Sequence, residues 1–127
     1  MASIFELEQA NFGRATQGRV LLAGGNADTT LTAAQSVESL ITVTPSTGRT
    51  YTTATAAEII SELGDSAIVG QCFEVTIVNL AGATHAVTFA GGGANVTVTG
   101  SATVAAASSA TFVGRVATSS TVIFYRK

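Results

Sequence analysis

The second half of the chain is a succession of short segments in which apolar and polar residues alternate. These segments are residues 71–80, 84–89, 95–99, 110–116 and 121–126. Short stretches rich in Gly, Ser and Ala separate them, and such stretches are typical of turns. Strands this short, recurring about every 10 residues, are typical of an antiparallel sandwich or barrel. We therefore expect a mainly β domain with an antiparallel β-sandwich or jelly-roll-like fold.

Alternation also assigns one face of each segment to the core, because successive side chains of a strand point to opposite faces. The expected core residues are Phe73, Val75, Ile77, Val87, Phe89, Phe112 and Phe124. The last segment is apolar on both faces, with Ile123 and Tyr125 on the face opposite Phe124. Such a strand is central in its sheet or lies in a subunit interface. We predict Ile123 and Tyr125 as subunit-interface residues.

One helix interrupts the β pattern. Thr55 and Glu58 have the spacing of a capping box, and apolar residues at helical spacing follow them. Gly64 stands where a left-handed residue would end the helix. We expect one short helix here, and we expect residues 40–44 and 49–53 to form strands before it.

Residues 1–28 differ from the rest of the chain. Large apolar residues precede glycines that disfavour one long helix, and two arginines each follow a glycine. A frayed terminus is the simpler alternative, but disordered tails carry few large apolar residues. We expect residues 1–28 to be an extended arm that docks on a partner or a neighbouring subunit, and residues 29–127 to form the β domain. The predicted docking residues are Ile4, Phe5, Leu7, Phe12, Arg14 and Arg19.

Composition narrows the classes of partner. The chain has 127 residues, which is enough for one domain. Charged residues make up only 11% and the net charge is −2, so we expect no binding to nucleic acid. No apolar run approaches the roughly 20 residues that cross a bilayer, and no basic and apolar leader opens the chain. We therefore expect a cytosolic origin and no membrane partner.

The residues that usually carry chemistry are sparse. Cys72 is the single cysteine and His85 the single histidine, so neither a disulfide framework nor a conventional zinc site is expected. Cys72 is interpreted as a small packing residue, and His85 as a partly exposed residue at a sheet rim or in an interface. Residues 91–93 are three glycines with no lysine or helix after them, so they predict a flexible hairpin loop rather than a phosphate site. We predict no catalytic, metal-binding or cofactor-binding residues, and a protein that is not an enzyme.

Several segments together resemble a module of virion proteins from tailed bacteriophages, including those of cyanobacteria. They lie within residues 50–127, apart from an arginine just before it, and are residues 49–52, 55–60, 69–79, 100–104, 109–112 and 122–126. In such phages the module is similar to head decoration proteins, also called capsid cement proteins. Its motifs are patterns of strand and turn residues rather than an active-site signature.

The resemblance implies a β-sandwich, commonly a homotrimer, that sits on the exterior of the capsid and stabilises the shell. It implies the major capsid protein as partner, synthesis in the host cytoplasm, and no catalytic residues. The alternatives are a phage tail or fibre module and a carbohydrate-binding β-sandwich. Sugar binding usually needs exposed aromatic platforms, whereas this chain has no Trp and only Tyr51 and Tyr125. A bacterial surface or scaffold protein is a third alternative, which the expected absence of a leader disfavours.

Overall fold

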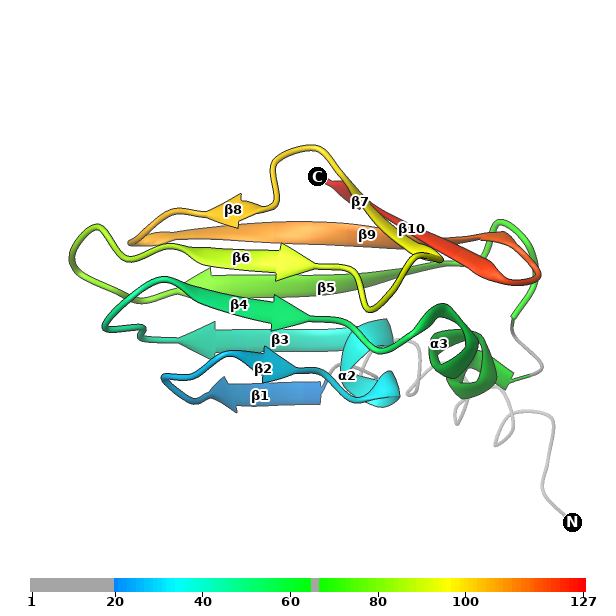
Figure 1. Cartoon of the computed structure of the whole chain (residues 1–127), viewed down its shortest axis with the longest axis horizontal. Coiled ribbons are helices and arrows are strands. Elements are labelled where there is room, and N and C mark those ends of the chain that lie inside the picture. Colours follow the sequence, from blue (N-terminus) through cyan, green and yellow to red (C-terminus); the bar gives the residue numbers. More distant parts are fainter. Residues whose placement is uncertain (1–19, 65–66) are drawn as a thin grey trace, which may run out of the picture.

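The computed structural model describes residues 20–64 and 67–127. In these residues the chain is mainly β, with two mixed sheets and two short helices (Figure 1). The strand order is β1-β3-β5-β9-β10-β7 in the six-stranded sheet, here the large sheet, and β2-β4-β6-β8 in the four-stranded sheet, the small sheet. The elements in chain order are β1 (Val20–Gly24), β2 (Thr29–Thr30), α2 (Ala33–Val37), β3 (Glu38–Val43), β4 (Arg49–Thr52), α3 (Ala56–Leu63), β5 (Cys72–Asn79), β6 (Val87–Ala90), β7 (Val96–Thr99), β8 (Thr103–Val104), β9 (Ser108–Thr118) and β10 (Thr121–Arg126).

The first six strands wind as three stacked coils. In each coil a strand of the large sheet is followed by a strand of the small sheet: β1 then β2, β3 then β4, and β5 then β6. Strands of successive coils pair in parallel, so that Leu22, Ile41 and Ile77 stand side by side across β1, β3 and β5. Figure 1 shows the three pairs of strands stacked on one another. Apolar side chains of successive coils therefore form a continuous row in the core.

The last four strands complete the two sheets. β8 is antiparallel to β6, β9 is antiparallel to β5, and β10 forms a hairpin with β9. β7 then pairs with the outer side of β10 in parallel. Five of the eight strand pairings in the described residues are parallel. The expectation of an antiparallel fold is therefore wrong for these pairs, because periodicity marks the faces of a strand and not the direction of its neighbour.

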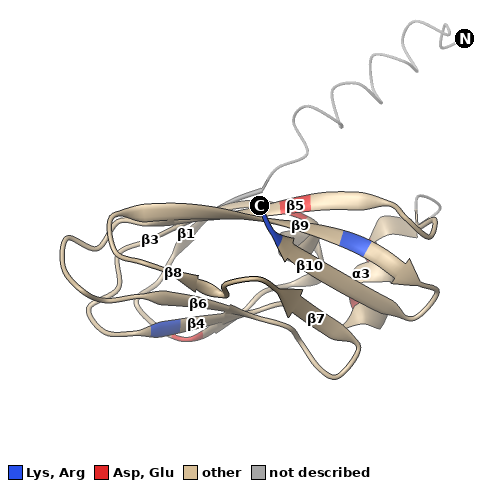
Figure 2. Ribbon diagram, turned by 90° about the horizontal axis from the view of Figure 1, so that it is seen from above, with Lys and Arg blue, Asp and Glu red and all other residues tan. Residues whose placement is uncertain are grey.

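The two sheets face each other across one hydrophobic core (Figure 2). Phe89 of the small sheet stacks on Phe112 of the large sheet, with ring centroids 4.4 Å apart. Phe124 meets Phe89 edge to face at 5.1 Å and Phe73 at 5.6 Å. Aromatic pairs in these two arrangements are favourable beyond the apolar area that they bury. The seven core residues expected from alternation are all buried.

The predicted helix is α3. The Thr55 hydroxyl accepts from Glu58 N at 3.2 Å, and Glu58 Oε1 accepts from Thr55 N at 3.1 Å, which is the expected capping box. Gly64 ends the helix at φ +60°. A second helix, α2, was not expected. It has the same box, formed by Thr32 and Gln35.

Residues 20–24, which the sequence placed in the N-terminal arm, form β1 and pair with β3. The following turn is tied to the next coil as well, because Asn26 Oδ1 accepts from Arg49 Nε at 2.9 Å and Asp28 Oδ1 accepts from Thr50 N at 3.0 Å. These residues thus belong to the folded unit, and the domain begins before the expected position 29.

The glycines at 91–93 do not form a hairpin loop, because β6 and β7 lie in different sheets. A Cβ atom at Gly91 would collide with the Val96 carbonyl, and one at Gly92 with the carbonyl of Thr53. Gly92 N donates to Thr53 Oγ1 at 2.9 Å. The expectation of a flexible loop is wrong here: glycine is required because two backbones pass in close contact.

Candidate interaction surface

The outer face of the large sheet is the broadest regular surface of the molecule. Residues that alternate with the core residues of β3, β5, β9 and β10 share this face, since their strands are in register. It carries Leu40, Thr42, Glu74, Thr76, Val78, Thr111, Val113, Arg115, Ile123 and Tyr125, all half-buried. Thr76 Oγ1 and Thr111 Oγ1 are hydrogen-bonded across β5 and β9 at 3.0 Å. The face is therefore composed mainly of aliphatic and aromatic side chains and threonines, and two of these threonines are hydrogen-bonded to each other.

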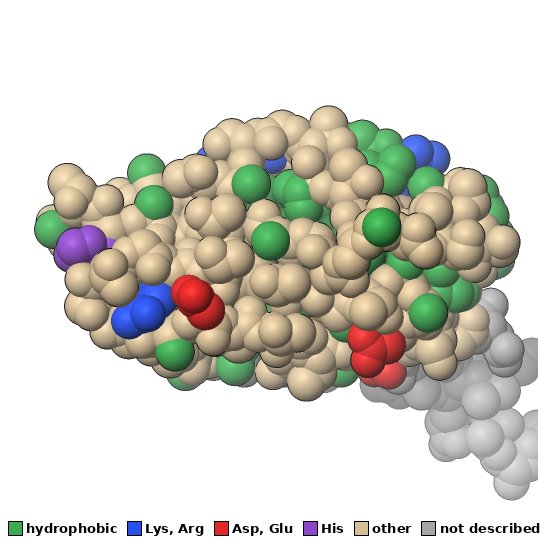
Figure 3. Space-filling view, viewed as in Figure 1, with side chains coloured by type: hydrophobic (Ala, Val, Ile, Leu, Met, Phe, Trp, Pro, Cys, Tyr) green, Lys and Arg blue, Asp and Glu red, His purple; other side chains and the backbone are tan. Residues whose placement is uncertain are grey.

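The outside of the small sheet has a different character. Figure 3 views the molecule from the side on which β2, β4 and β6 lie in Figure 1, and most of that surface is neither apolar nor charged. The charged positions are few and scattered over the ribbon in Figure 2. Of the two broad faces, the outer face of the large sheet is thus the one with half-buried aliphatic and aromatic side chains.

Ile123 and Tyr125, the predicted subunit-interface residues, lie on this face. Each is half-buried, and their strand β10 is flanked by β9 and β7 rather than lying at the sheet edge. Arg115 of β9 donates to Tyr125 Oη at 2.9 Å, and its guanidinium carbon lies 5.7 Å from the centre of the tyrosine ring. Arg115 thus contacts both the hydroxyl and the ring of Tyr125 on this face.

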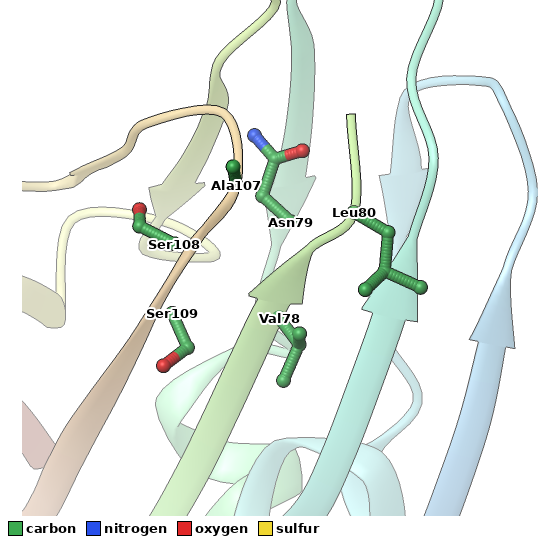
Figure 4. Close-up of a pocket in the computed structure, with 6 residues that line it drawn as sticks. All are labelled: Val78, Asn79, Leu80, Ala107, Ser108 and Ser109. Carbon is green, nitrogen blue, oxygen red and sulfur yellow. The ribbon is translucent and has the colours of Figure 1, made fainter. Parts of the chain in front are cut away.

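A shallow hollow of about 360 Å³ opens at the end of β5, between β5 and the start of β9 (Figure 4). The side-chain amide of Asn79, which lines the hollow, is hydrogen-bonded to the backbone of neighbouring loops. Asn79 Nδ2 donates to the carbonyls of His85 and Val104 at 2.9 and 3.0 Å, and Asn79 Oδ1 accepts from Ala81 N at 3.0 Å. The hollow thus offers a ligand little beyond Leu80, which is 56% exposed, and the surrounding serines.

The residues that could take part in chemistry lie apart from one another. His85 is half-buried in the connection between β5 and β6, as expected for a rim position. Cys72 is exposed at the start of β5, so its interpretation as a packing residue is wrong. Within residues 20–64 and 67–127 there is no group of three or more His, Cys, Asp or Glu side chains that could hold a metal ion. No helix among the described residues is long and apolar enough to span a membrane.

The predicted docking residues of the arm, from Ile4 to Arg19, lie outside the described residues. Sequence reasoning missed that Glu38 and Glu74 lie side by side on the outer face of the large sheet. Arg115 lies on the same face, on the neighbouring strand β9. Alternation places each of these residues on a face, but their proximity depends on which strands are neighbours, and no local pattern gives that order.

Comparison of the chain with family models, with curated proteins and with solved structures gives no match.

Proposed function

We propose that this chain is a structural virion protein that binds the outside of a phage capsid and stabilises the shell, as a homotrimer. The observation that carries the proposal is the outer face of the large sheet, which is broad and carries half-buried aliphatic, aromatic and hydroxyl side chains, with Glu38, Glu74 and Arg115 among them. A face of this kind is suited to extended contact with another protein surface. The partner in this proposal, the major capsid protein, is the one implied by the resemblance of segments within residues 50–127 to decoration proteins.

The packing of the chain supports a mechanical role. Two sheets with stacked phenylalanine rings between them, and parallel coils in register, suit a protein that has to reinforce a shell. The resemblance implies a β-sandwich, and the phenylalanine contacts between the sheets support such a two-layer arrangement. A trimer multiplies each contact, because bound neighbours hold the next site at high effective concentration.

In this proposal the N-terminal arm adds apolar anchors, Ile4, Phe5, Leu7 and Phe12, that dock between capsid subunits on the exterior of the particle. Burial of two such side chains is worth about 3–6 kcal/mol before ordering costs. The protein is made in the host cytoplasm and joins the capsid there.

The test is binding to purified undecorated capsids, measured by co-sedimentation with the full chain and with a chain lacking residues 1–13. We expect the shortened chain to keep its melting temperature and to bind capsids much more weakly. Val113→Glu, in the middle of the outer face, should also weaken binding, whereas Thr88→Glu on the outside of the small sheet is the matched control. Tight binding by both the shortened chain and Val113→Glu would exclude the proposed surface.

A phage tail or fibre module is a second candidate, and the stacked coils favour it. β1 and β2 are the terminal strands of their sheets in the described residues, and coiled stacks of this kind extend by adding units at an open end. The two candidates differ in stoichiometry. Hundreds of copies in each purified particle, counted by quantitative gel analysis, support the capsid position, and a handful support the tail.

A further inference from the structure

The large hydrophobic side chains that are exposed in the described part of the chain lie at the two ends of β5. Ile68 and Val69, which are 66% and 59% exposed, lie shortly before its start, and Leu80 directly follows its end. Figure 1 shows the start and the end of β5 at opposite ends of the molecule. Contiguous exposed apolar groups mark contacts with other molecules, so each end is a candidate for such a contact.

The pair before β5 is presented by a hydrogen-bonded β-turn, residues 68–71, here called the apolar turn. Gln71 N donates to Ile68 O at 2.8 Å, and Gly70 has the positive φ, +95°, that a type II turn requires at its third position. Two further backbone hydrogen bonds attach the turn to β9: Gly70 N donates to Val116 O at 2.8 Å, and Val116 N donates to Gln71 O at 3.0 Å. The two aliphatic side chains thus project from an already ordered backbone, which reduces the entropic cost of covering them.

The hollow at the other end of β5 offers aliphatic groups on the outer face of the large sheet. Val78 and Leu80 alternate onto that face, and Ser109 of β9 pairs in register with Val78 (Figure 4). Ala107 completes this side of the hollow at φ +56°, and no other non-glycine residue among those described has a positive φ. Glycine would adopt this conformation without strain, so the methyl group is kept here at a cost to the backbone. The Asn79 amide is engaged by the backbone, and the hollow therefore suits an aliphatic side chain.

The apolar turn adjoins the predicted subunit interface. Ile123 and Cys72 both pair in register with Arg115, so these three residues form one row across the outer face. Cys72 also follows the apolar turn directly in the chain. In a ring of three, each subunit uses one patch toward the preceding copy and a different patch toward the next. A trimer that uses the turn and Ile123 on one side therefore requires a second, complementary patch elsewhere on the chain.

We propose that the apolar turn of one copy inserts Ile68 and Val69 into the Leu80 hollow of the next copy, and that three such contacts close the trimer. The inference deepens the proposed function and rests on it for the number of subunits. An aliphatic protrusion and an aliphatic hollow at different places on one chain join successive copies, because each copy carries both halves of the contact. The contact joins the end of one molecule to the outer face of another, so it is heterologous.

The first test traps the contact as a disulfide in the isolated protein. In a Cys72→Ser chain, Val69→Cys and Ser109→Cys together place one thiol on the apolar turn and one in the hollow. The eight residues of β5, about 26 Å of strand, separate the two positions within a chain. An intramolecular bridge is therefore impossible, since a disulfide requires Cα atoms within about 7 Å. Mild oxidation should give covalent dimers and trimers on a non-reducing gel, and nothing larger.

The control moves the second thiol to the outside of the small sheet. Val69→Cys combined with Thr88→Cys, again in the Cys72→Ser chain, should give no covalent trimer. A ladder that continues beyond three subunits overturns the closed ring, and equal cross-linking of the two chains overturns the contact. The absence of cross-linking between Val69→Cys and Ser109→Cys also overturns it.

A charge exchange examines the same contact without a disulfide. Val69→Glu and Leu80→Lys should each raise the concentration at which the trimer dissociates by about tenfold or more in sedimentation, because each buries an unpaired charge between copies. The Val69→Glu/Leu80→Lys chain should recover most of that loss. Recovery has to arise between molecules, since the two positions lie at opposite ends of β5. Val69→Glu/Thr88→Lys is the control and should not recover. Circular dichroism checks that the exposed substitutions leave the fold intact, and losses that simply add in the exchanged chain overturn the proposal.

The outcomes distinguish this inference from the proposed function. A wild-type trimer that shows neither cross-linking nor charge recovery contradicts this inference alone. Cross-linked trimers that fail to co-sediment with undecorated capsids contradict capsid binding alone.

Discussion

Gly114 shows how a single residue can be required by packing rather than by a turn. It lies in the middle of β9, faces the core, and is flanked by Phe73 of β5 and Phe124 of β10. A Cβ atom at Gly114 would collide with the Phe73 ring. The missing side chain therefore makes the space in which the Phe73 ring lies across the sheet and meets Phe124.

We predict that Gly114→Ala lowers the free energy of unfolding by about 1–3 kcal/mol, because the new methyl group displaces a buried ring. Gly82→Ala is the matched control: a Cβ atom there meets nothing within 4 Å. Urea unfolding of both variants measures the difference. Adding Phe73→Leu to Gly114→Ala should recover part of the loss, and equal stability of the two alanine variants would contradict the packing argument.

Two buried serines give a contrasting pair. Ser36 Oγ donates to Thr32 O at 2.8 Å and accepts from Ala54 N at 2.9 Å. Ser39 Oγ is buried without a hydrogen-bond partner in the described structure. A buried hydroxyl with no partner keeps its desolvation cost, whereas a bonded one offsets it.

We predict opposite effects for the two alanine substitutions. Ser39→Ala should leave the free energy of unfolding unchanged or raise it by up to about 1 kcal/mol, and Ser36→Ala should lower it by about 1–3 kcal/mol. Chemical denaturation monitored by circular dichroism distinguishes them. A clear loss in Ser39→Ala would mean that its hydroxyl has a partner.

At the scale of elements, the two helices begin in the same way but differ in charge. In α2 the box is neutral: Gln35 Oε1 accepts from Thr32 N at 2.9 Å. In α3 the acceptor is the Glu58 carboxylate, and its hydrogen bonds with the backbone and side chain of Thr55 lower the pKa of Glu58 below 4.5. The unfolded chain therefore binds the proton before the folded chain does. The stabilisation is complete above about pH 4.5 and is lost as the pH falls through the lowered pKa.

We predict that Glu58→Gln reduces the dependence of stability on acid. The variant gives α3 the neutral box that α2 already has, so its melting temperature should fall less than that of the wild type between about pH 6 and pH 3. Gln35→Glu is the reciprocal variant and should add acid dependence at α2. Parallel pH profiles for Glu58→Gln and the wild type would exclude the capping carboxylate as a source of acid sensitivity.

The helix that sequence reasoning missed, α2, is marked by a repeated sequence motif. Residues 29–35 read Thr-Thr-Leu-Thr-Ala-Ala-Gln, and residues 52–58 read Thr-Thr-Ala-Thr-Ala-Ala-Glu. In the structure both segments lead from a strand of the small sheet into a capped helix. The repeat marks equivalent corners of two successive coils. It was overlooked because a helix of five residues is too short to show an apolar stripe.

At the scale of the molecule, the proposed trimer is the property that depends most on the outer face. Ile123 and Tyr125 lie there half-buried, and a ring around a threefold axis would cover such residues. Light scattering of the isolated protein should give about three times 12.7 kDa. Ile123→Glu should shift the protein toward the monomer, whereas Thr88→Glu should not. A monomer for the wild type at micromolar concentration would contradict the predicted interface in solution.

The sequence by itself determined where most strands lie and which side of each strand is buried. Phe73, Phe89, Phe112 and Phe124 were assigned to the core correctly because alternation is a local consequence of strand geometry. The capped start of α3 was equally local, since Thr55 and Glu58 are three residues apart. For the same reason, Ile123 and Tyr125 could be assigned to the face away from the core.

Only the tertiary structure decided which strands are neighbours. The parallel coils, the membership of residues 20–24 in the large sheet, and the proximity of Glu38 to Glu74 all depend on contacts between distant parts of the chain. A strand has the same period of two whether its neighbour is parallel or antiparallel, so periodicity leaves this choice open. Gly92 likewise depends on a distant contact: a Cβ atom there would collide with the Thr53 carbonyl, so the segment after β6 can lie against the segment after β4 because residue 92 has no side chain.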